Sequence, residues 1–161
     1  MPEAEPHRLI AWDRELADAH QRLRQALQVA RAALDARDAG DTVGVQSARA
    51  DLTLYCHGFC AALGGHHGGE DTALFPQLSA QYPALRPAIV KLRQDHELIA
   101  GLLTQFDQAI SSDAPPAELS LQLDGLAAIM ESHFRYEERQ LLGPLSALEL
   151  DADPHTVLGP L

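Results

Sequence analysis

The sequence predicts an all-α protein built from four helices. Leucine and alanine supply most of the apolar side chains, whereas aromatic residues make up only 5% of the 161 residues. This composition suits helices better than sheets. Four segments also repeat apolar residues three or four positions apart, which is the spacing of one helical face. A chain of this length folds as one domain without a metal to hold it together, so any bound metal is expected to serve a function.

The expected helices cover about residues 9–38, 42–81, 85–110 and 119–141. Pro83 stops the second helix, because proline disfavours a helical conformation in the residue before it. Pro76 marks a kink or an end within that helix, and the fourth helix should end near Pro144. We therefore expect a helical domain over residues 1–148 and a C-terminal tail over residues 149–161.

Charge and hydropathy make two classes of partner unlikely on physical grounds. The formal net charge is −11, without a cluster of lysines or arginines, so nucleic acid is not expected to bind. No apolar stretch approaches the roughly 20 residues of a membrane span, and the acidic N-terminus does not resemble a signal peptide. Cys56 and Cys60, one helical turn apart, should be reduced packing residues. A cytoplasmic protein that binds neither nucleic acid nor membrane is the expectation.

Histidines and glutamates recur on the helical stripes. Residues 66–70 and 133–137 each have the pattern His-x-x-x-Glu, which places both side chains on one helical face, about 6 Å apart. His20 and His96 lie within the stripes of the first and third helices. Burying all of these groups without partners would cost several kcal/mol, and a pair of metal ions removes that cost. The predicted metal ligands are His20, His66, Glu70, His96, His133 and Glu137.

Three further residues stay open as additional ligands, namely Tyr55, His57 and His67. His67 is four residues from Asp71, so a change of register by one residue would present this pair instead. The position of the following Leu-Phe-Pro sequence favours His66, and His67 is then expected beside the site or at the surface. Tyr55 is expected in the core, away from the metals, and His57 at the surface.

Four glycines surround the two histidines of the second helix, namely Gly64, Gly65, Gly68 and Gly69. Each costs up to about 1 kcal/mol relative to alanine inside a helix, so a compensating role is expected. Three explanations remain open. The glycines leave room for a ligand beside the metals, permit a π-bulge, or allow close packing.

These patterns resemble the hemerythrin-like proteins with the histidine-histidine-glutamate cation-binding domain. The resemblance covers about residues 9–148 and is carried by Asp18-Ala19-His20, His66 to Glu70 with Leu74-Phe75-Pro76, Asp95-His96, and His133 to Glu137 with Glu138 and Leu141. It implies an up-down-up-down four-helix bundle and two Fe ions, bridged by both glutamates and an oxo or hydroxo group. Oxygen-carrying hemerythrins use five histidines, whereas four are placed here. The open coordination positions favour a reactive centre over a carrier.

We therefore expect a non-haem di-iron protein that binds dioxygen or reacts with peroxide or nitric oxide, in sensing or protection. Imidazoles with carboxylates suit iron, because oxygen-rich ligand sets favour manganese or magnesium and thiolate sets favour zinc. One alternative is a di-iron oxidase or peroxidase-type enzyme acting on a small organic substrate. The other is an iron-storage or iron-sensing module whose metal does no chemistry. Either a monomer or a homodimer is compatible with the sequence.

Overall fold

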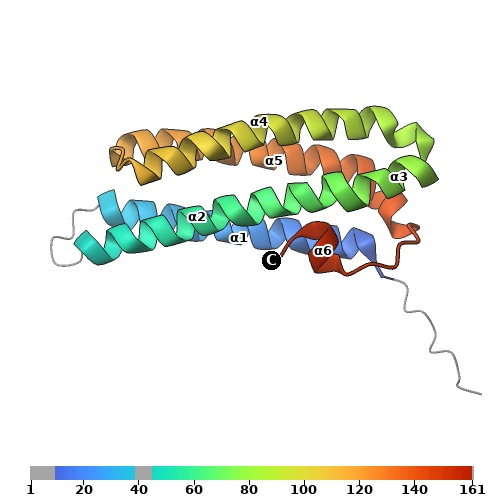
Figure 1. Cartoon of the computed structure of the whole chain (residues 1–161), viewed down its shortest axis with the longest axis horizontal. Coiled ribbons are helices and arrows are strands. Elements are labelled where there is room, and N and C mark those ends of the chain that lie inside the picture. Colours follow the sequence, from blue (N-terminus) through green and yellow to red (C-terminus); the bar gives the residue numbers. More distant parts are fainter. Residues whose placement is uncertain (1–9, 39–44, 161) are drawn as a thin grey trace, which may run out of the picture.

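The computed structural model describes residues 10–38 and 45–160, and the regular elements of that part of the chain are all helical. The long helices are α1 (Trp12–Asp38), α2 (Val45–Gly69), α4 (Arg86–Ser111) and α5 (Pro116–Ser146). Figure 1 shows them side by side and running alternately in opposite directions. The all-α class is confirmed, but the chain has more helices than the four expected, since α3 (Phe75–Gln81) and α6 (Pro154–Leu158) are also present. The expected start of the first helix at residue 9 lies outside the described residues.

The segment expected as one second helix is a helical path with a change of pitch. α2 ends at Gly69, residues Glu70–Leu74 form a π-helical turn, and α3 follows directly. Pro76 lies in the first turn of α3, where proline is best tolerated in a helix. A π-helical turn changes the direction in which the following side chains point. Of the three explanations offered for the glycines, the π-bulge is therefore present in the structure, directly after Gly69.

The fourth helix continues beyond its expected end. α5 runs to Ser146 and contains Pro144 in its last turns. Leu141 and Leu145 lie on the same face and are 0% and 1% exposed, so their packing holds this part of the chain helical despite the proline. The expected end near Pro144 was placed too early because the sequence does not show this packing.

Two apolar clusters fill the bundle on either side of a polar layer. Leu23 and Phe106 belong to one cluster, and Leu16 and Leu141 belong to the other. On α1, His20 lies between the members of the two clusters. α4 and α5 have the same order of apolar, polar and apolar residues, and so does the helical path from α2 through the π-helical turn into α3. The polar layer thus crosses the middle of the bundle.

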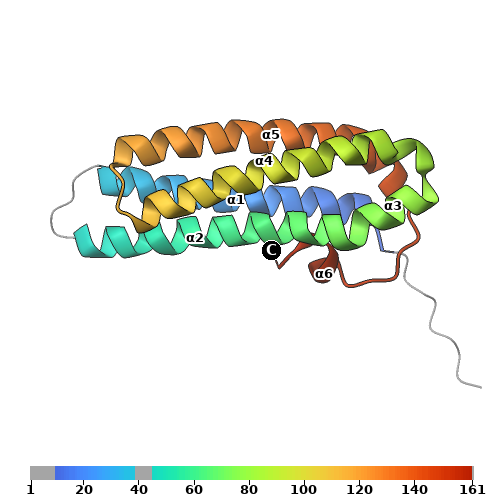
Figure 2. The ribbon, with the colours of Figure 1, turned by 45° about the horizontal axis from the view of Figure 1, so that its top comes forward.

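The C-terminal segment packs against the bundle. Helix α6 contacts α1, α2 and the π-helical turn (Figure 2). Val157 and Leu158 are 1% and 4% exposed and belong to the same cluster as Trp12. The indole Nε1 of Trp12 also donates a hydrogen bond to the carbonyl of Leu150, at 3.0 Å. The domain boundary at residue 148 stays a prediction, but residues beyond it share the core of the bundle.

The outer faces of the long helices carry isolated apolar side chains. Leu54, Leu98 and Leu121 are each more than half exposed, and they belong to three different helices. Within residues 10–38 and 45–160, none of the helices is long and apolar enough to cross a membrane. The cytoplasmic location stays a prediction.

Candidate metal centre

The six predicted ligands meet in the polar layer, together with one further histidine. Two groups of possible ligand atoms lie there, and within each group the atoms are within 4.8 Å of one another. The first group contains His20, His66, Glu70 and Glu137, and the second contains His67, His96 and His133. All seven side chains are buried. Their roles as ligands stay predictions, but the structure brings each of them to one place from α1, α2, α4, α5 and the π-helical turn.

Glu70 and Glu137 belong to the first group and also face the second. Oε2 of Glu137 is 3.4 Å from Nε2 of His20 and 3.5 Å from Nε2 of His133. Oε1 of Glu70 is 2.8 Å from Nε2 of His66 and 4.0 Å from Nε2 of His96, which belongs to the second group. Each carboxylate therefore faces imidazoles of both groups.

Many of the buried nitrogen and oxygen atoms of the two groups have no hydrogen-bond partner among the described residues. They are Nε2 of His20, His66 and His67, and both carboxylate oxygens of Glu70 and Glu137. Nε2 of His66 and Oε1 of Glu70 are 2.8 Å apart, but their orientation is not that of a hydrogen bond. A buried polar atom without a partner costs about 1–3 kcal/mol, and native proteins satisfy nearly all such atoms. A metal ion would bind several of them together. The orphaned atoms and the set of imidazoles with carboxylates thus fit a metal centre.

Four of the imidazoles are held through their other ring nitrogen, Nδ1. The partners are Glu138 for His20 at 2.9 Å, the Leu158 carbonyl for His66 at 2.8 Å, Asp71 for His96 at 2.8 Å and Asp95 for His133 at 3.2 Å. Such partners fix the tautomer and orientation of a metal-binding histidine. Each bond directs Nε2 into the centre.

Burial keeps two of the imidazoles neutral. It lowers the pKa of His66 to about 3, with the His20 imidazole adding to the effect. Burial also lowers the pKa of His67 well below its ordinary value, and the neighbouring His96 contributes. A neutral imidazole has the lone pair that binds a metal. His66 and His67 are thus in the metal-binding form at neutral pH.

Glu70 and His20 bind their protons more strongly than usual, and the nearby Glu137 carboxylate contributes to both effects. Burial and the nearby Glu137 raise the pKa of Glu70 well above its usual range. Burial acts to lower the pKa of His20, but Glu137 and Glu138 outweigh it and the pKa is raised. The metal-free centre therefore holds protons, and binding of a cation would displace them.

His67, which the sequence left open as an additional ligand, lies in the centre and not at the surface. It is 5% exposed, and its ring stacks on that of His96 with 3.9 Å between the ring centroids. The pairs His66–Glu70 and His67–Asp71 are not alternatives, because Glu70 enters the centre while Asp71 holds His96. The site is wide enough for adjacent residues of α2 to reach different groups. The four-residue spacing of His67 and Asp71 was the signal for this arrangement.

The other two candidate ligands lie away from the centre. Tyr55 is 43% exposed, so the expectation that it lies in the core was wrong. His57 is partly exposed, as expected, and pairs with Asp107. Cys56 and Cys60 are free thiols, and burial raises their pKa values to about 11 and about 12. They are protonated in the metal-free protein, and neither belongs to the two groups of possible ligand atoms.

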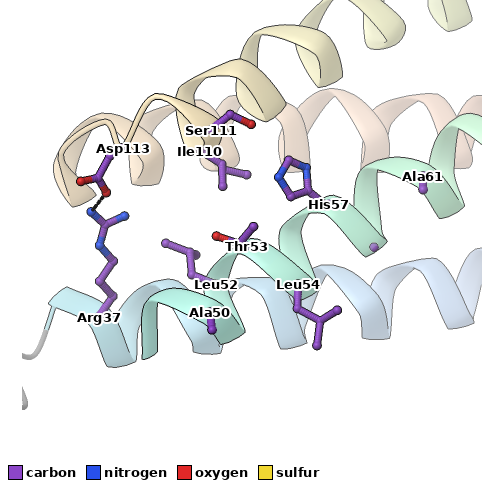
Figure 3. A pocket seen from close by; sticks show the side chains of 11 residues that line it. Arg37, Ala50, Leu52, Thr53, Leu54, His57, Ala61, Ile110, Ser111 and Asp113 are labelled. Carbon is purple, nitrogen blue, oxygen red and sulfur yellow. Dashed lines mark hydrogen bonds and ion pairs between the residues drawn. The ribbon is translucent and has the colours of Figure 1, made fainter. Parts of the chain in front are cut away.

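A wide pocket near one end of the bundle is separate from this centre. Its volume is about 1140 Å³, and its lining includes Leu52 and His57 of α2 and Ile110 of α4. Figure 3 shows these residues with the ion pair of Arg37 and Asp113, whose atoms are 2.7 Å apart. The lining contains none of the seven buried residues of the centre.

The four glycines of α2 form two pairs with different surroundings. A Cβ atom on Gly69 would lie 2.3 Å from the carbonyl oxygen of Val157, and Gly65 faces the same C-terminal segment. A Cβ atom on Gly64 or Gly68 would meet no atom of the described residues within 4 Å. Close packing against the C-terminal segment therefore explains Gly69. A Cβ atom on Gly65 would make only an ordinary contact of 3.5 Å with Pro160, and Gly64 and Gly68 border open space.

Alanine substitutions should separate these two pairs. We expect Gly69→Ala to destabilise the protein by about 1–3 kcal/mol, because the new methyl group collides with the backbone of Val157. We expect Gly64→Ala to be neutral or to stabilise by up to about 1 kcal/mol, because alanine favours the helix. Thermal unfolding of both variants without metal measures the difference. Equal stability of the two variants would show that the C-terminal segment is not packed against Gly69.

A helical bundle that gathers imidazoles and carboxylates in a buried layer defines a class of metal-binding proteins. The family model described as the Hemerythrin HHE cation binding domain matches residues 13–145. The chain belongs to this hemerythrin family. Comparisons with curated proteins and with solved structures gave no match.

Proposed function

We propose that the protein is a non-haem di-iron protein that binds dioxygen or reacts with peroxide or nitric oxide, in sensing or protection. The observation that carries this proposal is the pair of adjacent groups of possible ligands, in which Glu70 and Glu137 of the first group also face histidines of the second. His20 and His66 would hold one ion, and His67, His96 and His133 the other. Small ligands are the proposed partners of a monomer or homodimer, without nucleic acid or membrane.

The donor atoms favour iron. Imidazole binds iron, zinc, copper and nickel, whereas carboxylates favour harder ions, and a mixed set is suited to iron. Iron would supply a change between ferrous and ferric states, which is the chemistry needed to bind or reduce a small oxidant. An oxo or hydroxo group bridging the ions, as in the family that the sequence resembles, belongs to this proposal.

The residues of the chain would hold and orient this centre. Glu138 fixes the ring of His20 through Nδ1 and is itself 3.4 Å from the Arg24 guanidinium. The ring of Phe134 stacks on the imidazole ring of His20, with 3.8 Å between the ring centroids. The charged pair outside and the aromatic ring inside keep water away from His20, so that its Nε2 stays directed at the centre.

Two other functions remain as alternatives. The part of the surface groove that borders His67 and His96 has a volume of about 250 Å³, which suits a diatomic molecule or peroxide next to the centre. A larger organic substrate would have to extend into the neighbouring pocket of about 510 Å³, so the oxidase stays an alternative. A storage or sensing module without chemistry would use the same ligands, and reactivity alone distinguishes it.

Iron loading followed by a reactivity screen tests the proposal. We expect purified protein to bind two iron ions and to gain charge-transfer absorption, and we expect that spectrum to change with dioxygen, hydrogen peroxide or nitric oxide. Bound metal should also stabilise the fold by about 4 kcal/mol at a thousandfold excess over Kd, seen as a raised Tm. Elemental analysis gives the number and identity of the ions.

Each negative result has a separate meaning. Iron that binds but does not respond to any of the three oxidants, and that a mild chelator removes, supports the storage module. A preference for zinc over iron contradicts the proposal itself. Turnover of an organic reductant with peroxide, at a rate that depends on iron, supports the oxidase alternative.

A further inference from the structure

A pocket opens on the metal centre between α2 and α4, which lie side by side (Figures 1 and 2). Its volume is about 250 Å³, and His67 and His96 form its inner wall. His67 is 5% exposed, and its Nε2 has no hydrogen-bond partner among the described residues. The pocket therefore ends at a side chain of the centre whose Nε2 is buried behind it and lacks a partner.

The outer walls of the pocket are formed by residues with little or no side chain. Gly64 and Gly68 line it on α2 and Ala100 lines it on α4. The three positions are exposed, and no described atom fills the space next to either glycine. Larger side chains at these positions would close the pocket. Their small size explains why two of the four glycines persist inside α2 although glycine is unfavourable in a helix.

The pocket continues along the surface. A second pocket of about 510 Å³ shares Gly64, Ala100 and Leu103 with the first, and it extends toward His57 and Cys60. The two together form a groove between α2 and α4. A molecule in the groove reaches His67 after passing the shared residues.

Other sides of the centre are covered. Phe134 stacks on His20, and Arg24 lies 5.4 Å from the Phe134 ring centroid. On the α2 side that faces the C-terminal segment, the Leu158 carbonyl binds His66 and Leu158 is buried. The side between α2 and α4 lacks such a cover.

The charge at the pocket indicates which ligands pass. Asp71 and Glu97 line it together with the apolar Leu103. Asp71 is occupied by His96 at 2.8 Å, whereas Glu97 is exposed. Carboxylates at an opening repel anions and leave uncharged molecules unaffected.

We propose that the pocket bordered by Gly64, Gly68 and Ala100 is the access route by which small uncharged ligands, such as dioxygen, nitric oxide or hydrogen peroxide, reach the metal centre beside His67. This inference rests on the proposed function, because it presupposes bound iron. It adds the route, the residues that keep it open and the exclusion of anions.

The test compares one substitution at two positions of α2. Gly64→Leu fills the pocket, whereas Gly58→Leu adds the same side chain at another exposed position that also has no described atom within 4 Å. Nitric oxide is mixed with ferrous protein in a stopped-flow instrument, and iron content is measured on the same samples. We expect Gly64→Leu to slow association on the order of tenfold, equivalent to about 1.4 kcal/mol of barrier. Gly58→Leu should match the unmodified protein.

The outcomes separate the route from the function. Equal association rates in all three proteins with equal iron content would overturn the access route and leave the di-iron proposal intact. Failure of the unmodified protein to bind iron would instead overturn the proposed function. For the charge, Glu97→Gln should accelerate binding of azide at low salt but leave nitric oxide unchanged. An equal effect on both ligands would overturn the selection against anions.

Discussion

Replacing His67 with leucine is expected to weaken binding of one of the two proposed metal ions while leaving the bundle folded. His67 is buried and contributes an unpaired Nε2 to the group with His96 and His133. Leucine has a similar size, and replacing a buried polar group that lacks a partner by an apolar one is neutral or stabilising. The metal-free variant should therefore keep its Tm or exceed that of the parent protein.

The loss should appear in metal binding. Removal of a partner that only orients a ligand already weakens binding about 10- to 100-fold, and loss of a direct ligand should weaken it at least as much. Titration with ferrous ion, read by competition with a coloured chelator, measures both sites. His57→Leu is the control, because His57 pairs with Asp107 outside the two groups. Undiminished affinity for both ions in His67→Leu would show that His67 is not a ligand.

Deleting residues 149–161 is expected to lower both stability and metal affinity. The deletion removes Val157 and Leu158, which are 1% and 4% exposed. Burial of two such side chains contributes about 3–6 kcal/mol, which corresponds to a fall in Tm on the order of 10 °C for a protein of this size. The deletion also removes the Leu158 carbonyl that accepts the Nδ1 hydrogen bond of His66, at 2.8 Å.

A double substitution separates the two effects. Val157→Ala with Leu158→Ala shortens the buried side chains but keeps the backbone carbonyl that orients His66. We expect it to lose stability and to retain most of the metal affinity, whereas the deletion should lose about 10- to 100-fold in affinity as well. Thermal unfolding without metal and chelator competition measure the two quantities. Unchanged affinity after the deletion would contradict the role of the Leu158 carbonyl.

The helices were largely predictable because their signals are local. Apolar residues at helical spacing depend only on neighbours in the chain, and they predicted the regions of α1, α4 and α5. The failures occurred where a contact overrides the local signal. α5 continues through Pro144 because Leu145 is buried on the core side.

The candidate centre was predictable for the same reason. Two His-x-x-x-Glu pairs and two histidines on apolar stripes identified the side chains that meet in the polar layer. The sequence did not show whether His66 or His67 faces the core, because adjacent residues of a helix point only about 100° apart. How closely the neighbouring helices pack against α2 decides whether one or both of these histidines are buried.

The sequence by itself determined an all-helical chain, its family, and the imidazoles and carboxylates of a buried polar layer, since these follow from spacing along each helix. Only the tertiary structure decided that His67 joins the second group and that α2 changes to a π-helical turn at Glu70–Leu74. It also decided that His66 receives its partner from Leu158, 92 residues further along the chain. Such contacts depend on how distant segments pack, which no local spacing encodes.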